Sequence, residues 1–198
     1  MLTGKISPYK TMNTKQSIRK ELLKKRNTLT EEDCQNYSKM IEKQLLSSEQ
    51  YRNAQILLIY AAYQKEVSTY GIIKHALCDV KKVFCPKVLS PEVMEFYQIF
   101  SLADIIAGYK NIPEPKIIET PYDNINQQRS LMILPLVGFD SYKNRLGYGG
   151  GFYDRYLQQF SGMKSIGLGF ECQKYEPGIP TETTDIKPNF IITETNIY

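Results

Sequence analysis

A glycine-rich segment in the carboxyl-terminal half carries the residues best suited to chemistry. It reads Arg145-Leu-Gly-Tyr-Gly-Gly-Gly-Phe-Tyr-Asp-Arg155, with glycine at four of the five positions 147–151. Because glycine lacks a Cβ, the backbone N–H groups of such a loop can converge on an anion. Arg145 offers a guanidinium whose geometry matches phosphate oxygens. Asp154 is placed to bind a Mg²⁺ that accompanies a nucleotide. The segment therefore predicts a phosphate-binding loop.

The two common phosphate-binding motifs are absent. G-x-G-x-x-G would need glycine at position 152, where Phe152 stands, and G-x-x-x-x-G-K-[ST] occurs nowhere. The alternative is a glycine-rich surface turn. Each glycine can destabilise the fold by up to about 1 kcal/mol, so four together need a compensating role. A helix expected over residues 151–160 would direct its positive N-terminal end at the same anion.

The segments around this loop alternate between strand-like and helix-like patterns. Strands are expected at 56–60, 82–85, 94–99, 131–134, 165–170 and 189–193, and helices at 14–26, 31–48, 68–80 and 151–160. This alternation predicts an α/β fold with a mainly parallel central sheet covered by helices on both faces. Residues 111–129 are interpreted as a long surface connection.

The length of 198 residues suits one large domain. Residues 1–13 are interpreted as a loose leader, and residues 14–198 as a single domain. Hydrophobic residues make up 42% and charged residues 23% of the chain, which are ordinary values for a globular protein. The longest apolar stretch, Ile56 to Tyr63, is far shorter than the roughly 20 residues of a membrane span. We expect a soluble, cytoplasmic monomer that acts without a membrane.

Positive charge is concentrated at the amino-terminal end. Residues 1–30 hold eight Lys or Arg and one acid, Glu21, although the whole chain carries only +4. Such an end can bind nucleic acid, an anionic membrane or a phosphorylated small molecule, or can simply be a solvated helix face. Tyr9 is the one aromatic residue before Tyr37, so the aromatic side chains that stack on bases are missing. Nucleic acid is therefore not the expected partner.

Histidine and cysteine chemistry is not indicated. His75 is the single histidine and lies in a helix-like stretch, and the four cysteines form no CxxC pair. A zinc site would need an unusual spacing, and a histidine-dependent mechanism would depend on one residue.

Five segments, taken together, resemble the 5-formyltetrahydrofolate cyclo-ligase family, whose members are also called 5,10-methenyltetrahydrofolate synthetases. They are Lys15-Gln-Ser-Ile-Arg19, Gln64-Lys-Glu-Val-Ser-Thr69, Asn111-Ile-Pro-Glu-Pro115, the glycine-rich segment, and Pro180-Thr-Glu-Thr-Thr-Asp185. The resemblance covers most of the chain from Lys15 onward. It implies a three-layer α/β/α fold similar to the isomerase and CoA-transferase-like folds.

The activity implied by the resemblance is the ATP- and Mg²⁺-dependent cyclisation of 5-formyltetrahydrofolate to 5,10-methenyltetrahydrofolate, with release of ADP and phosphate. ATP would phosphorylate the formyl oxygen, and N10 would attack the resulting iminium phosphate. Such phosphoryl transfer depends mostly on positioning and on neutralising oxygens. The implied substrate is a small folate, with or without a polyglutamate tail.

The resemblance also implies a role for each matching residue. The expected catalytic groups around the phosphates are Lys15, Arg19 and Arg145. The expected remainder of the ATP site is Leu146, Gly147, Tyr148, Gly149, Gly150, Gly151, Phe152 and Tyr153. The folate would contact Ala61, Glu66, Tyr148, Phe152 and Tyr153. Mg²⁺ would be held by Asp154 and Asp185.

Each role has a structural alternative. Lys15 and Arg19 could be surface charges, although their spacing places them on one helix face. Glu66 could complement the dipole of the following helix, and Asp185 could cap a turn. Phe152 and Tyr153 could belong to the core.

Three positions depart from the family pattern. Ala61 stands where a larger apolar residue is frequent, Phe152 stands where Tyr is common, and Gly150 replaces a basic residue of some members. None removes a group that the implied mechanism requires. Two other functions stay open: a non-catalytic relative that binds RNA through the basic helix, and a sugar-phosphate isomerase or acyl-CoA transferase on a related fold.

Overall fold

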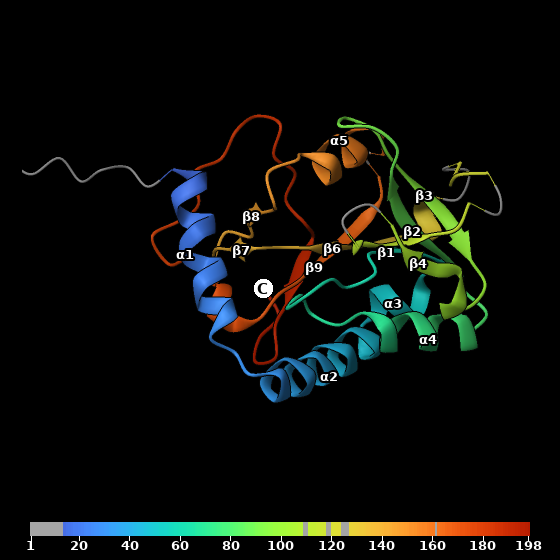
Figure 1. The fold of residues 1–198 in the computed structure, drawn as a ribbon, viewed down its shortest axis with the longest axis horizontal. Helices are drawn as coiled ribbons and strands as arrows, with labels where there is room; N and C mark the ends of the chain where they lie inside the picture. Colours follow the sequence, from blue (N-terminus) through green and yellow to red (C-terminus); the bar gives the residue numbers. More distant parts are fainter. Residues whose placement is uncertain (1–13, 109–110, 118–119, 124–126, 161) are drawn as a thin grey trace, which may run out of the picture.

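The computed structural model describes residues 14–108, 111–117, 120–123, 127–160 and 162–198 (Figure 1). The expected leader over residues 1–13 lies outside them. The helices are α1 (Lys15–Asn27), α2 (Glu31–Ser47), α3 (Glu49–Asn53), α4 (Tyr70–Cys78) and α5 (Phe152–Gln158), with 3₁₀ turns η1 (Leu102–Asp104), η3 (Gln127–Arg129) and η4 (Glu171–Gln173). The strands are β1 (Ile56–Ile59), β2 (Lys82–Val88), β3 (Met94–Ile99), β4 (Ile105–Ala107), β5 (Pro113–Pro115), β6 (Ser130–Pro135), β7 (Gly138–Phe139), β8 (Arg145–Leu146), β9 (Lys164–Leu168) and β10 (Phe190–Ile192).

Six strands form the central sheet in the order β10-β9-β6-β1-β2-β3. The neighbours from β10 to β2 pair in parallel, and β3 alone is antiparallel, at one edge. β1 lies between β6 and β2, and its four residues are all buried. A short, continuously apolar strand is typical of this central position in a parallel sheet. The predicted mainly parallel α/β sheet is confirmed.

Helices cover both faces of the sheet (Figure 1). Leu57 and Ile59 point toward α2, α3 and α4 and belong to the larger hydrophobic cluster. Ile56 and Leu58 point the other way, into a second cluster that contains Tyr156 and Leu157 of α5. Consecutive strand residues alternate between faces, so β1 contributes side chains to both hydrophobic clusters. The expected three layers are present, with α5 the main helix on the second face.

Helix α1 lies to one side of these layers, next to the short ribbon of β7 and β8. Ile18 and Leu22 are fully buried against Val137, Leu146 and neighbouring residues. Among the described residues, no helix has the length and apolar character needed to cross a membrane.

The interpretation of residues 111–129 as a surface connection is only partly correct. β5 pairs with β4, Pro121 bridges Tyr97 of the edge strand, and Tyr122 is buried with its hydroxyl 2.8 Å from Ser130 Oγ. Proline-rich segments can still pair at a sheet edge, where a missing N–H is tolerated. Residues 118–119 and 124–126 lie outside the described residues.

A buried aspartate organises the hairpin that leads into the glycine-rich segment. Asp140 is 1% exposed, and its Oδ1 accepts hydrogen bonds from the backbone N–H groups of Tyr142 and Asn144, both at 2.9 Å. Its Oδ2 accepts from the N–H of Ile179, also at 2.9 Å. The carboxylate thereby joins the hairpin to a distant loop and sets the point at which Arg145 begins β8.

Candidate active site

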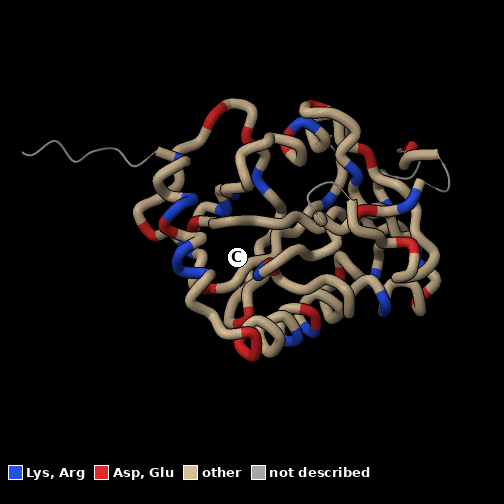
Figure 2. The backbone as a smooth tube through the Cα atoms, in the orientation of Figure 1, with Lys and Arg blue, Asp and Glu red and all other residues tan. Residues whose placement is uncertain are grey.

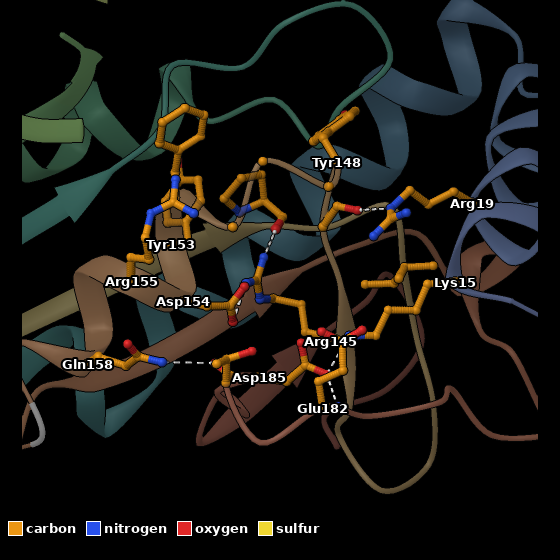
Figure 3. A pocket seen from close by; sticks show the side chains of 18 residues that line it. Lys15, Arg19, Arg145, Tyr148, Tyr153, Asp154, Arg155, Gln158, Glu182 and Asp185 are labelled. Atoms are coloured by element: carbon orange, nitrogen blue, oxygen red, sulfur yellow. Dashed lines mark hydrogen bonds and ion pairs between the residues drawn. The ribbon is translucent and has the colours of Figure 1, made fainter. Parts of the chain in front are cut away.

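The glycine-rich segment borders a cleft of about 490 Å³ (Figure 3). Helix α1 forms one wall, α5 another, and the segment 182–185 a third, while Pro135 contributes the end of β6. The lining residues are Lys15, Arg19, Pro135, Arg145, Leu146, Gly147, Tyr148, Gly149, Gly150, Gly151, Phe152, Tyr153, Asp154, Arg155, Gln158, Glu182, Thr184 and Asp185. The structure therefore brings together every residue that the sequence assigned to ATP and metal.

Glycine is required at two positions of this loop. Gly149 has φ +104° and Gly151 has φ +66°, which are backbone conformations that other residues rarely adopt. Gly151 also precedes α5 without any side-chain cap. The loop therefore exposes backbone, not side chains, to the cleft at these positions, as a phosphate cradle needs.

Lys15 reaches across the cleft to two carboxylates. Its Nζ donates to Asp185 Oδ1 at 2.8 Å and Oδ2 at 2.7 Å, and lies 3.1 Å from Glu182 Oε1. Burial lowers the pKa of Lys15, but these acids outweigh it, so the pKa lies above its ordinary value. Burial raises the pKa of Asp185, but hydrogen bonds from Lys15 and from the Glu182 N–H at 2.7 Å bring it below its ordinary value. Asp185 thus caps a turn and also contacts the cleft cation.

Arg19 lies one helical turn after Lys15 and faces the glycine loop. Its Nε donates to the carbonyl oxygen of Gly147 at 2.7 Å, and its guanidinium carbon is 3.5 Å from the position that a Cβ of Gly149 would take. Residues four apart lie on one face of a helix, so α1 directs both cations into the cleft. They are not merely surface charges.

Arg145 forms an ion pair with Asp154. Its Nη2 donates to both carboxylate oxygens at 3.0 Å, and its Nη1 donates to the Pro135 carbonyl at 3.3 Å. The Arg145 side chain is only 3% exposed, against 22% for Asp154. The N–H of Ile186 donates to Asp154 as well, at 3.1 Å. The guanidinium expected at the phosphates and the carboxylate expected at the metal therefore bind each other across the cleft floor.

The residues expected at the folate lie in two groups. Phe152 and Tyr153 line the cleft and also pack against the core, and Tyr153 makes an edge-to-face contact with Phe96. Ala61 is buried after β1, and Glu66 follows in the same loop, but neither lines the 490 Å³ cleft. Tyr148 connects the groups.

Arg26 Nη1 donates to the Tyr148 hydroxyl at 2.8 Å, and this hydroxyl lowers the pKa of the Glu66 carboxyl nearby. The N–H of Tyr63 donates to Glu66 Oε2 at 2.8 Å. Burial raises the pKa of Glu66, and the hydrogen bonds and the charge of Arg26 only partly counter it. No acid lies in the first turn of α4, so Glu66 does not complement that helix dipole. It is instead a partly buried carboxylate beside the glycine loop.

Several cleft residues were missed by the sequence reasoning: Pro135, Arg155, Gln158, Glu182 and Thr184 line the cleft, and Arg26 supports it. A signal for Arg26 exists, because Ile18, Leu22 and Arg26 follow one another at intervals of four and are the buried residues of α1. An arginine on an otherwise apolar helical stripe indicates a specific buried partner. Arg155 and Glu182 lie close in the sequence to expected site residues, but no motif pointed to either of them separately.

The carboxylates present suit a magnesium ion that is carried by a nucleotide. The described residues contain no cluster of three or more His, Cys, Asp or Glu side chains that could hold a metal by themselves. Asp154 and Asp185 nevertheless line one cleft. Mg²⁺ is usually bound by one or two carboxylates together with substrate phosphates, so this pair fits such an ion.

Comparisons with known proteins identify the family of this chain. The sequence model described as the 5-formyltetrahydrofolate cyclo-ligase family matches residues 11–194. The 5-formyltetrahydrofolate cyclo-ligase of Haemophilus influenzae is 32% identical over 182 residues, covering 88% of this chain and 96% of its own. The mouse cyclo-ligase is 29% identical over 192 residues, covering 92% and 94%.

Two solved structures share the fold. The 5,10-methenyltetrahydrofolate synthetase of Aquifex aeolicus superimposes with a TM-score of 0.77 at 27% identity, covering 92% of this chain and 91% of that one. The synthetase of Mycoplasma pneumoniae gives a TM-score of 0.73 at 23% identity, covering 91% and 98%, which shows the shared fold alone. With a family match over nearly the whole length and a relative above 30% identity, the chain belongs to the 5-formyltetrahydrofolate cyclo-ligase family of ATP-dependent enzymes.

Proposed function

We propose that the protein catalyses the ATP- and Mg²⁺-dependent cyclisation of 5-formyltetrahydrofolate to 5,10-methenyltetrahydrofolate, releasing ADP and phosphate. Family membership supports the reaction class. The observation that carries the proposal is the cleft itself, in which Lys15, Arg19 and Arg145 surround a glycine loop next to two carboxylates. Phosphoryl transfer requires such cations, loop and carboxylates, because it depends on positioning and charge neutralisation more than on a strong base.

The chemistry has two steps. The formyl oxygen attacks the γ-phosphorus of ATP, the bond from that phosphorus to the bridging oxygen breaks, and ADP leaves. This converts a poor leaving group into phosphate and gives an iminium phosphate on the folate. N10 then attacks the formyl carbon, the carbon–oxygen bond breaks with its electrons going to phosphate, and N10 gives up its proton to solvent.

The residues of α1 and the glycine loop hold the nucleotide. Lys15 and Arg19 contact the phosphate oxygens, and the backbone N–H groups of positions 147–151 complete the cradle. Arg145 stabilises charge on the transferred phosphoryl group from the cleft floor. Asp154 and Asp185 would hold the magnesium ion, which would supply further neutralisation of phosphate charge.

The folate lies on the Glu66 side of the loop. Glu66 accepts hydrogen bonds from the pterin, and Ala61, Tyr148, Phe152 and Tyr153 supply the surrounding walls. A partly buried carboxylate next to aromatic side chains suits a flat heterocycle that carries N–H donors. Tyr148 belongs to the glycine loop and lies beside Glu66, so it adjoins both substrates.

The alternative of an RNA-binding relative has less support from the charges. Figure 2 shows several Lys and Arg positions along α1. Of these, Lys15 and Arg19 point into the cleft, Arg26 is 3% exposed, and Lys25 pairs with Glu21 at 2.8 Å. Much of the basic charge that could contact a phosphate backbone therefore has partners within the protein.

The test follows methenyl absorbance and ADP release together, with purified protein, Mg-ATP and 5-formyltetrahydrofolate. Equal amounts of both products, abolished by chelation and restored by added Mg²⁺, are expected. ADP without methenyl product would indicate a different acceptor. A folded protein with neither turnover nor ATP binding would rule the proposal out and favour RNA binding, which a gel-shift assay with the same preparation would detect.

A further inference from the structure

Arg155 faces the cleft from the first turn of α5, at some distance from the two cations of α1 (Figure 3). Its Nε donates to the carbonyl oxygen of Glu92 at 3.1 Å, and its guanidinium carbon lies 5.0 Å from the centre of the Phe152 ring. These contacts engage Nε and the face of the guanidinium, and no hydrogen bond within the described part of the chain uses its terminal nitrogens.

The four basic side chains that line the cleft differ in what neutralises them. Lys15 and Arg145 have carboxylate partners at 2.7 to 3.1 Å. Arg19 and Arg155, within the part of the chain that the structure describes, have backbone carbonyl partners but no carboxylate within 4.0 Å. Arg155 Nη2 is moreover buried and has no hydrogen-bond partner among the residues that the structure describes, as is also true of Arg145 Nε. A buried donor without a partner is costly, and a cation without a counter-charge attracts an anion.

The glycine loop leaves room for this guanidinium. A Cβ at Gly151 would lie 2.7 Å from Arg155 Nη1, closer than such atoms can approach. The absence of a side chain at Gly151 therefore lets Arg155 lie directly against the backbone that cradles the anion. Arg155 and the glycine loop thus line the same cleft.

We propose that Arg155 binds a phosphate of the nucleotide, from the side of the cleft opposite Arg19. The inference rests on the proposed function for the identity of the nucleotide. A guanidinium suits this task because it stays charged and offers parallel donors to phosphate oxygens. Two other roles are distinguishable: binding of a folate carboxylate, and a purely structural contact with Phe152 and Glu92.

The experiment measures binding by calorimetry, with ATP and with 5-formyltetrahydrofolate separately. Four proteins are compared: wild type, Arg155→Gln, Arg155→Lys and the control Arg52→Gln, which removes an exposed arginine of α3. Arg155→Gln should weaken ATP binding at least tenfold and leave folate binding within twofold. Arg155→Lys, which keeps the charge, should recover most of the loss. Arg52→Gln should bind both like wild type.

Three results would overturn the proposal: unchanged ATP affinity in Arg155→Gln, a loss confined to the folate, or equal losses in the Gln and Lys variants together with equal falls in melting temperature. Turnover of the wild type is measured in parallel. If ATP binding depends on Arg155 but no methenyl product forms, the proposed reaction fails and the assignment of Arg155 stands. If the wild type forms methenyl product normally but Arg155→Gln binds ATP unchanged, the proposed reaction stands and the assignment of Arg155 fails.

Discussion

Lys15 Nζ lies 2.7 Å from Asp185 Oδ2, although 170 residues of sequence separate them. The first turn of α1 is thereby attached to the segment that leads into the last strand of the sheet. Because both residues line the cleft, this ion pair closes one side of it. It also places the cation proposed for the phosphates and the carboxylate proposed for the metal within contact distance, so the proposed Mg-nucleotide would contact both.

Removal of the Lys15 charge should weaken catalysis more than it weakens the fold. Lys15→Met is expected to lower kcat/KM for ATP by about 10- to 100-fold, since a hydrogen bond to a charged group is worth about 1.5–3 kcal/mol. The matched control is Lys20→Met, an exposed lysine of the same helix. Steady-state kinetics at saturating folate provide the measurement, and equal effects of the two substitutions would contradict the assignment.

The Arg145–Asp154 pair should show strong coupling in stability. Arg145→Met leaves Asp154 without its charge partner and should lower the free energy of unfolding by about 3 kcal/mol, near the lower end of the range for breaking a buried pair because Asp154 is 22% exposed. The double variant Arg145→Met/Asp154→Asn should lose less than the sum of the single losses, as measured by urea denaturation. Additive losses would show that the two side chains do not interact.

Arg145 should also matter for turnover. Arg145→Ala is expected to raise the KM for ATP or lower kcat by tenfold or more, because the variant lacks the guanidinium at the cleft floor. Stopped-flow and steady-state assays would separate the two parameters. An unchanged kcat/KM in a folded Arg145→Ala protein would remove this residue from the site.

A comparison of two glycines should separate backbone strain from nucleotide binding. Gly151→Ala combines an unfavourable φ of +66° with a Cβ that collides with Arg155, so both stability and ATP affinity should fall. Gly178 also has a positive φ, +89°, but no atom lies within 4 Å of its would-be Cβ and it does not line the cleft. Gly178→Ala should therefore lose about 1 kcal/mol of stability and keep its ATP affinity. Thermal melts and calorimetry would record both quantities.

Glu66 should make stability depend on pH in a defined direction. Burial raises its pKa in the folded protein, so its contribution to stability is fully present below the pKa of the unfolded chain and is lost as pH rises through the folded pKa. Relative to Glu66→Gln, the wild type should therefore become less stable as pH increases from the ordinary carboxyl pKa through the raised one. Denaturation at several pH values would measure this difference. A constant difference, or one of opposite sign, would contradict a raised pKa of Glu66 in the folded protein.

Local patterns in the sequence determined the elements and the character of the loop. Thr30 followed by acids predicted the start of α2, and its side chain does form a capping box with Asp33. The continuous apolar run after Gln55 predicted the buried strand β1. Four glycines beside Arg145 predicted a loop whose backbone could bind phosphate, and this loop lines the cleft. Such signals work because helix caps, burial on both faces and glycine conformations are properties of a few consecutive residues.

Only the tertiary structure decided which charges are paired and which are free. Lys15 and Asp185 are 170 positions apart and Arg26 and Tyr148 are 122 apart, so the sequence around each residue does not reveal its partner. Arg145 and Asp154 are only nine positions apart, and their contact depends on the path of the glycine loop between them. The sequence therefore predicted that the cations, glycines and aspartates assigned to ATP and metal belong to one site, and all of them line one cleft. Folding determined that Arg155 keeps a buried donor with no partner in the described part of the chain, because pairing depends on which side chains come within a few ångströms of one another.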